Sequence, residues 1–396
     1  MNDTHQIVLA GSARTPIGKF CGSFRELTAA DLGVISAEAS IQSAGISPQE
    51  IDFTWLGCGR QAGSGPNVAR QIAYRVGVPN TSPATTVNMA CASSLDALIS
   101  AARAIKLGEI EVSLVGGTES MSRVPYMIFD ARWGIPFGQS KLVDSMYHDG
   151  FHCKLCDMLM GATADKLAKQ KNISRQAQDE YALMSQQRAE KAQRAGLFTD
   201  EIVPVTIKSR KGEKTFDSDE HPRHGSTLAG LAKLKPVFAS DGTVTAGNAC
   251  GITDGASTMI ALSKAKATEL GVTPEAELIG YSQSGVEPDI MGLGPVPAIK
   301  SLLKQTGMTL GDVDLIELNE AFAGQVLACN SELGIDLDKL NVNGGAIALG
   351  HPIGATGARI ITTLLSALQQ RDKEIGLAAL CVSGGQGTAI LVKRLS

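Results

Sequence analysis

The chain contains one sequence pattern twice, and this repeat limits the folds open to it. Residues 44–53 read AGISPQEIDF, and residues 306–315 read TGMTLGDVDL. In both copies the aligned segment contains a glycine at its second position and continues into an apolar, strand-like run. The first run ends at Gly57-Cys58 and the second at Asn319-Glu320. A chain of 396 residues with this repeat is expected to form two similar halves.

Apolar strand-like runs alternate with helical patterns toward both ends of the chain. We expect strands at residues 7–10, 53–57, 84–87, 112–116 and 375–382. We expect helices at residues 30–44, 68–76, 93–107 and 359–370. Such alternation is typical of βαβ units around a largely parallel, buried sheet, so the sequence predicts the α/β class.

The character of the sequence changes between the two halves. Residues 123–148 show no regular pattern, and residues 208–223 form a charged, loop-like stretch. Helices are expected between them, near residues 161–171 and 174–195. We interpret this part as a large insertion that covers the core. The predicted domains are residues 1–120 with 249–272, the covering insertion 121–248, and residues 273–396.

Three positions in loops or at strand ends could carry chemistry. Cys91 precedes a strong helical pattern, where free N–H groups and the helix dipole stabilise a thiolate. His351 lies in the glycine-rich loop GGAIALGHPIGATGAR, and Cys381 ends an apolar strand. The structural alternatives are a buried cysteine, a loop histidine bound to local carbonyls, and a strand-end core residue. A histidine and a cysteine at paired loop mouths favour acid/base or nucleophilic chemistry.

Further short segments accompany these residues in a fixed order. They are GTESMS at residues 117–122, AGNA at 246–249, NEAF at 319–322 and GHP at 350–352. Together with Cys91 and Cys381, they make the chain resemble the thiolase family over nearly its whole length. The resemblance implies a thiolase-like fold with two similar βαβ-rich halves. These halves would stack as an αβαβα layered core, with a covering loop domain inserted in the first half.

The resemblance also implies a role for each catalytic residue. Cys91 would be the nucleophile that carries the acyl group as a thioester, and His351 the base that activates it. Cys381 would be the general acid/base at the α-carbon. His351 and a water held by Asn319 would form one oxyanion hole, and the backbone N–H groups of Cys91 and Ser383 a second one. Taken alone, Asn319 could simply cap the helix that follows it.

The implied activity is acyl transfer, the reversible Claisen condensation of two acetyl-CoA into acetoacetyl-CoA and CoA through an acetyl-cysteine. CoA thioesters would be the substrates, with no further cofactor. A degradative 3-ketoacyl-CoA thiolase of broader chain length is the alternative. A decarboxylating ketoacyl synthase would pair its cysteine with two histidines, so Asn319 and Cys381 argue against it. The intact set of catalytic residues argues against a non-catalytic binding protein.

The residues expected to contact the substrate depart from the family pattern in places. Cys250 stands where the family has a serine that contacts pantetheine, and a thiol is a weaker donor. Leu159 stands where acetoacetyl-CoA-forming members usually have a histidine, so the acyl length stays open. Arg223, together with the basic run 208–214, is expected near the adenine-phosphate end of CoA. The other expected substrate contacts are Met160, Ala321 and Phe322.

Composition narrows the partners and the compartment. The net charge of −4 and the pI near 5.9 give no electrostatic reason to bind nucleic acid, and no apolar run has membrane-spanning length. Eight cysteines, without a signal-peptide-like start or a peroxisomal Ser-Lys-Leu end, favour reduced thiols in a cytoplasmic protein.

Two further expectations concern metal binding and assembly. His148, His152, Cys153 and Cys156 lie close together in the sequence, but their spacing fits no standard zinc site, so we expect no metal. The resemblance implies self-association as a homodimer through an edge strand. It also implies a homotetramer of such dimers, joined through residues 123–143.

Overall fold

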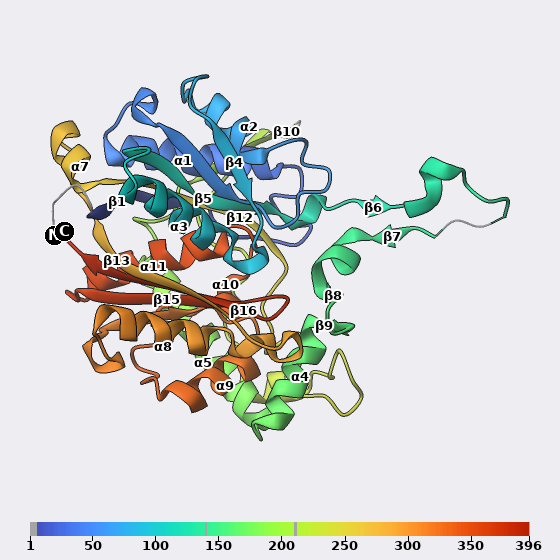
Figure 1. The fold of residues 1–396 in the computed structure, drawn as a ribbon. Helices are drawn as coiled ribbons and strands as arrows, with labels where there is room; N and C mark the ends of the chain where they lie inside the picture. Colours follow the sequence, from blue (N-terminus) through green and yellow to red (C-terminus); the bar gives the residue numbers. More distant parts are fainter. Residues whose placement is uncertain (1–5, 139–140, 210–211, 396) are drawn as a thin grey trace.

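The computed structural model describes residues 6–138, 141–209 and 212–395. The main body of the molecule consists of two halves (Figure 1). The strands of the first half are β1 (Ile7–Arg14), β2 (Gly18–Lys19), β3 (Phe53–Gly57), β4 (Ala84–Val87), β5 (Val112–Ser120) and β12 (Thr253–Ser263). Its helices are α1 (Ala29–Ala44), α2 (Val68–Arg75), α3 (Ser93–Lys106) and α7 (Lys264–Leu270).

The second half has the same kinds of element. Its strands are β13 (Ala276–Gly285), β14 (Leu315–Leu318), β15 (Ile375–Val382) and β16 (Gln386–Arg394). Its helices are α8 (Pro295–Thr306), α9 (Ala323–Leu333), α10 (Ala346–Leu349) and α11 (Thr356–Gln370). The segment between β5 and β12 contains β6 (Tyr126–Met127), β7 (Val143–Asp144), β8 (His152–Cys153), β9 (Met158–Leu159), α4 (Met160–Gln170), α5 (Arg175–Arg194), β10 (Val205–Ser209), β11 (Gly212–Phe216) and α6 (Leu228–Ala232).

The repeat in the sequence is confirmed in the backbone. Gly45 ends α1 and Gly307 ends α8, each with a φ of 69°, the left-handed conformation that glycine adopts without strain. In both copies a single turn of 3₁₀ helix follows, and the chain then enters β3 or β14. The two copies therefore start equivalent strands in the two halves.

The strands form one path in the order β14-β15-β16-β13-β1-β12-β5-β3-β4, with β2 paired to β12. The halves meet at a short pairing of β1 with β13. Only β3 with β4 and β5, and β14 with β15, are parallel, so our prediction of a largely parallel sheet is wrong. The antiparallel strand β12 is buried along its whole length, and therefore lacks the alternation that usually marks antiparallel strands.

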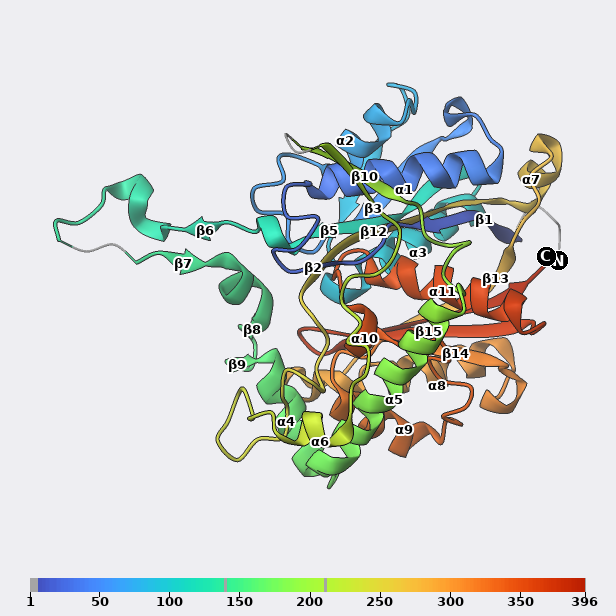
Figure 2. The ribbon, with the colours of Figure 1, turned by 180° about the vertical axis from the view of Figure 1, so that it is seen from behind.

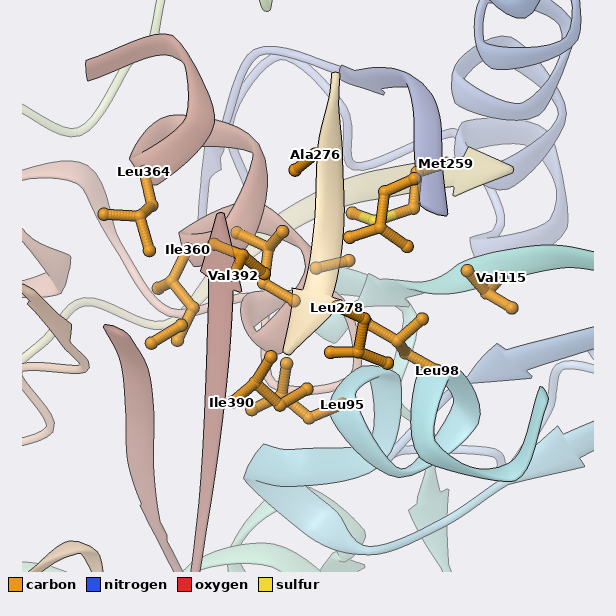
Figure 3. Packing of buried hydrophobic residues seen from close by; sticks show 14 of the residues in the cluster. Leu95, Leu98, Val115, Met259, Ala276, Leu278, Ile360, Leu364, Ile390 and Val392 are labelled. Carbon is orange, nitrogen blue, oxygen red and sulfur yellow. The ribbon is translucent and has the colours of Figure 1, made fainter. Parts of the chain in front are cut away.

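Helices cover and separate the two halves of the sheet, giving the predicted αβαβα layers (Figures 1 and 2). The outer face of the first half carries α1 and α2, and that of the second carries α8. The helices α3 and α11 lie between the halves. Figure 3 shows this central layer, where Leu95 and Leu98 of α3 lie among side chains of β13 and β16. Burial of each such leucine side chain stabilises the folded state by about 1.5–3 kcal/mol relative to leaving it exposed.

The charged stretch at residues 208–223 is not simply a loop, as the sequence suggested. Its first part belongs to an antiparallel hairpin of β10 with β11. Val205 and Phe216 of this hairpin pack with Phe24 and Leu32, so a few apolar side chains fix strands whose other residues are mostly polar or charged. Residues 210 and 211, inside the predicted basic run, lie outside the described residues.

The irregular segment after β5 forms an arm that projects from the body (Figures 1 and 2). Its two limbs pair briefly where β6 meets β7 in antiparallel register. The arm then returns through β8 and β9 to α4, which packs against the second half. The segment thus connects the end of β5 with the surface of the opposite half.

Candidate active site

Cys91 lies in a single turn of 3₁₀ helix, Ala90–Ala92, directly before α3. Ala90 has a φ of 44°, a strained value for a residue with a side chain. The Ser93 hydroxyl holds this turn, because it donates to the Ala90 carbonyl at 2.6 Å and accepts from the Met89 N–H at 3.0 Å. The first residue of α3 therefore stabilises the strained turn. The Cys91 side chain stays partly exposed.

The surroundings of the Cys91 thiol both oppose and favour ionisation. Burial raises the pKa of the Cys91 thiol above its ordinary value. The positive charge of Arg60 and hydrogen bonds from the backbone N–H groups of Ser383 and Cys91 offset part of this rise. The thiol is thus mainly protonated at neutral pH, and a base is needed to make it a nucleophile.

His351 is buried, and its protonation state follows from its neighbours. Its Nδ1 lies 2.6 Å from the Thr356 hydroxyl, which itself donates to the Pro352 carbonyl at 2.9 Å. The hydroxyl must therefore accept from Nδ1–H, which leaves a lone pair on Nε2. Within the described residues Nε2 has no hydrogen-bond partner. The alternative of a histidine bonded to local carbonyls does not hold.

His351 is also a neutral imidazole at neutral pH. Burial and the positive charges of Arg359 and Arg60 lower its pKa to about 3. A neutral ring with a free Nε2 lone pair can accept a proton from a thiol.

Cys381 is the last residue but one of β15 and is buried beside the other site thiols. The pKa of the Cys381 thiol lies well above its ordinary value, mainly because the thiol is buried. The neighbouring thiols of Cys91, Cys329 and Cys250 raise it further. Burial and Cys91 likewise raise the pKa of Cys250 to about 12. The structure thus brings Cys91, Cys250 and Cys381 together from three separate segments.

Asn319 follows β14, and its backbone N–H donates to the Ala379 carbonyl at 2.9 Å. Its side chain is buried, yet neither the amide oxygen nor the amide nitrogen has a partner among the described residues. It does not cap the next helix, because α9 begins after Phe322 and has no side-chain cap. A buried amide without a protein partner is a ready hydrogen-bonding group for a ligand.

Two buried glutamates, to which the sequence analysis gave no role, hold the loops that carry these residues. Glu320 accepts hydrogen bonds from Tyr181, Ser185 and the Ile347 N–H, at 2.7–3.0 Å, and so fixes α10 just before His351. Glu119 accepts from the N–H groups of Gly59, Arg60 and Gly354 at 2.8–3.0 Å, and so joins the two halves. In the sequence, the feature that could have indicated both glutamates is an acidic residue at or just after the end of an apolar, strand-like run.

A mainly apolar cavity of about 430 Å³ opens beside these residues. Four of the predicted site residues line it, namely His351, Cys250, Met160 and Phe322. Ala321 lies behind the wall, in one apolar cluster with Cys381 and Met160. Leu159 is not part of the lining. Arg223 lies near the cavity, since its guanidinium donates to the carbonyl of the lining residue Ala246 at 3.3 Å.

The histidines and cysteines between residues 148 and 156 have ordinary partners. His148 lies 2.6 Å from Asp149, and His152 lies 2.9 Å from Asp157. In the described part of the chain, no group of three or more histidines, cysteines or acidic residues is arranged to hold a metal ion. None of the helices in that part is both long and apolar enough to cross a membrane.

A layered α/β fold that brings together two thiols, a neutral histidine and a buried amide is typical of an acyltransferase. Comparison with known proteins agrees: residues 7–265 match the family model "Thiolase, N-terminal domain", and residues 272–394 match "Thiolase, C-terminal domain". The chain belongs to the thiolase family.

Individual relatives are similar along nearly their whole length. The acetyl-CoA acetyltransferase of Paracoccus denitrificans is 47% identical over 387 residues, covering 98% of this chain and 99% of the relative. The crystal structure of the Bacillus anthracis acetyl-CoA acetyltransferase has a TM-score of 0.97 and 43% identity, covering 99% of each chain. Human mitochondrial 3-ketoacyl-CoA thiolase in complex with CoA has a TM-score of 0.95 and 41% identity, covering 99% of this chain and 98% of the other.

Proposed function

We propose that this chain is an acetyl-CoA C-acetyltransferase, which condenses two acetyl-CoA into acetoacetyl-CoA and CoA and also runs the reverse reaction. The observation that carries the proposal is the neutral His351, whose free Nε2 lies in a site with two thiols of raised pKa. Relatives named acetyl-CoA acetyltransferase, at up to 47% identity, support the choice of acyl group. CoA thioesters are the only partners that the reaction needs, and we propose no cofactor.

In the first half-reaction, His351 Nε2 takes the proton of the Cys91 thiol, and the sulfur attacks the acetyl carbonyl carbon. The negative charge that develops on the carbonyl oxygen faces the backbone N–H groups of Cys91 and Ser383. When the carbon–sulfur bond to CoA breaks, His351 returns the proton to the departing sulfur. Acetyl-Cys91 and CoA are the products, and His351 is neutral again.

The second half-reaction uses Cys381 as the base toward a second acetyl-CoA. Cys381 acts here as its thiolate, and burial, which holds the pKa of the thiol well above its ordinary value, makes that thiolate a strong base. This thiolate takes the α-proton, while His351 and a water held by Asn319 stabilise the enolate oxygen. The enolate carbon attacks acetyl-Cys91 and the carbon–sulfur bond to Cys91 breaks. The released Cys91 sulfur takes the former α-proton from Cys381, which returns Cys381 to its thiolate.

Acyl-chain length is tested by comparing thiolysis of acetoacetyl-CoA with thiolysis of longer 3-ketoacyl-CoA thioesters. We expect acetoacetyl-CoA to have the higher kcat/KM. One or two extra methylenes in the acyl chain should lower this value by about 10–200-fold. The apolar cavity, with Met160 and Phe322 in its wall, favours a degradative 3-ketoacyl-CoA thiolase as the second candidate. A kcat/KM that rises with chain length would select this candidate. Leu159 lies outside the lining, so we do not expect it to set the limit alone.

We further propose that the protein works in the cytoplasm as a homotetramer built from dimers. The strand β4 ends the sheet and is available for pairing with a second copy. The arm exposes large apolar side chains that a tetramer would cover, namely Tyr126, Phe129, Trp133, Ile135, Phe137 and Leu142. Light scattering at micromolar concentration should give the mass of four chains. A mass of two chains would contradict the role of the arm, and a mass of one chain would contradict both interfaces.

A further inference from the structure

Arg60 is a charged residue in the site that the reaction steps above do not use. It follows β3, and its backbone N–H donates to Glu119 at 3.0 Å. The residue before Arg60, Gly59, lies against both catalytic loops. A methyl group added to Gly59 would lie 2.9 Å from the Ile353 side chain and 3.7 Å from the Ala90 carbonyl oxygen. Arg60 is therefore anchored between the loop of Cys91 and the loop of His351.

The arm holds the side chain of Arg60 in place. The guanidinium carbon lies 5.9 Å from the centre of the Phe151 ring, within reach of a cation–π interaction. A methyl group added to Gly150 would lie 2.6 Å from Arg60 Nε, so a side chain at position 150 would displace the guanidinium from this place. One guanidinium nitrogen donates to the Gly59 carbonyl at 3.3 Å, and the buried Nε has no partner among the described residues.

We infer that Arg60 is a positioning residue for the acyl transfer: its fixed guanidinium provides the positive field in which the Cys91 thiol gives up its proton. A guanidinium remains positively charged across the working pH range. This inference rests on the proposed function, because it assumes that Cys91 is the reacting thiol.

The charges around Cys91 from each neighbouring element are consistent with this role. Among the described residues, Arg60 after β3 is the cation whose charge acts most strongly on the Cys91 thiol, and Glu119 of β5 opposes it. The thiols of Cys250 and Cys381 and the neutral ring of His351 complete the surroundings. The charge of Arg60 lowers the pKa of both Cys91 and His351, so it favours the thiolate while keeping the base unprotonated.

The test measures the rate at which iodoacetamide alkylates Cys91 as a function of pH, with the modified peptide identified by mass spectrometry. Arg60→Gln removes the charge and keeps much of the side-chain length. We expect its alkylation inflection to rise by about one pH unit, so that alkylation at lower pH slows about tenfold. Arg60→Lys should restore most of the wild-type profile, which a purely structural role would not predict. Arg75→Gln, an exposed arginine of α2 paired with Asp31, is the matched control and should keep the wild-type inflection.

The wild-type protein offers a second measurement that does not depend on the folding of any variant. A cation beside Cys91 should favour the anionic reagent iodoacetate over iodoacetamide, relative to the ratio for a free thiol such as glutathione. Equal ratios for Cys91 and the free thiol, or equal inflections for the wild type and Arg60→Gln, would overturn the role of Arg60. Alkylation that bypasses Cys91 would instead overturn the proposed function.

Discussion

His351→Ala is expected to slow acetylation of Cys91 by acetyl-CoA about 100- to 10,000-fold, the usual loss when a general base is removed. Among the described residues of the site, His351 is the neutral, buried proton acceptor for the Cys91 thiol, whose own pKa is raised by burial. The measurement is single-turnover formation of acetyl-enzyme. His148→Ala is the control, because His148 lies in the arm outside the cavity lining and should leave this rate unchanged.

The low pKa of His351 adds a pH prediction in the wild type. Its pKa of about 3 lies below the ordinary 6.5, so the ring stays neutral and the acetylation rate should show no loss of base near pH 6.5. An unfolded chain binds this proton more readily than the folded protein. His351 therefore lowers the stability of the fold progressively as the pH falls from about 6.5 toward 3. A rate that falls with an inflection near pH 6.5, and loses that inflection in His351→Ala, would contradict a permanently neutral ring.

Cys381→Ala is expected to separate the two half-reactions. Acetylation of Cys91 should remain within a few-fold of the wild type, because Cys381 takes no part in that step. Exchange of the α-protons of acetyl-CoA and formation of acetoacetyl-CoA should fall about 100- to 10,000-fold, since the base is missing. Cys329→Ser is the matched control, as Cys329 is equally buried but its thiol donates to the Gly292 carbonyl. A parallel loss of both half-reactions would contradict the assignment.

The elements that the sequence predicted best are those fixed by local chemistry. The helix expected to end at residue 44 ends there as α1, because Gly45 follows it with left-handed backbone. Strand β15 occupies the predicted residues 375–382, because a long apolar run ends at a glycine-rich turn. The strands that were missed or misjudged depend on distant partners. Nothing local distinguishes a doubly covered antiparallel strand such as β12 from a parallel one.

The site shows the same division between local and long-range information. Cys91, His351 and Cys381 could be singled out because each stands in a loop or strand end of unusual composition. The hydrogen bond from His351 to Thr356, which leaves Nε2 free, depends on the geometry of the turn before α11. The positions of Glu119 and Arg60 could not be predicted, since their partners come from segments far apart in the chain. Sequence patterns therefore indicated the reacting groups, and the structure revealed what orients and charges them.

The role of Cys91 is tested most directly by peptide mass spectrometry of Cys381→Ala protein after incubation with acetyl-CoA and rapid acid quenching. We expect one acetyl group per chain, on the peptide that contains Cys91, and this group accumulates because the second half-reaction is blocked. Treatment with CoA should remove this group again by the reverse of acetylation. An acetyl group on another cysteine, or an unmodified Cys91 under these conditions, would contradict the claim that Cys91 is the nucleophile of a thiolase reaction.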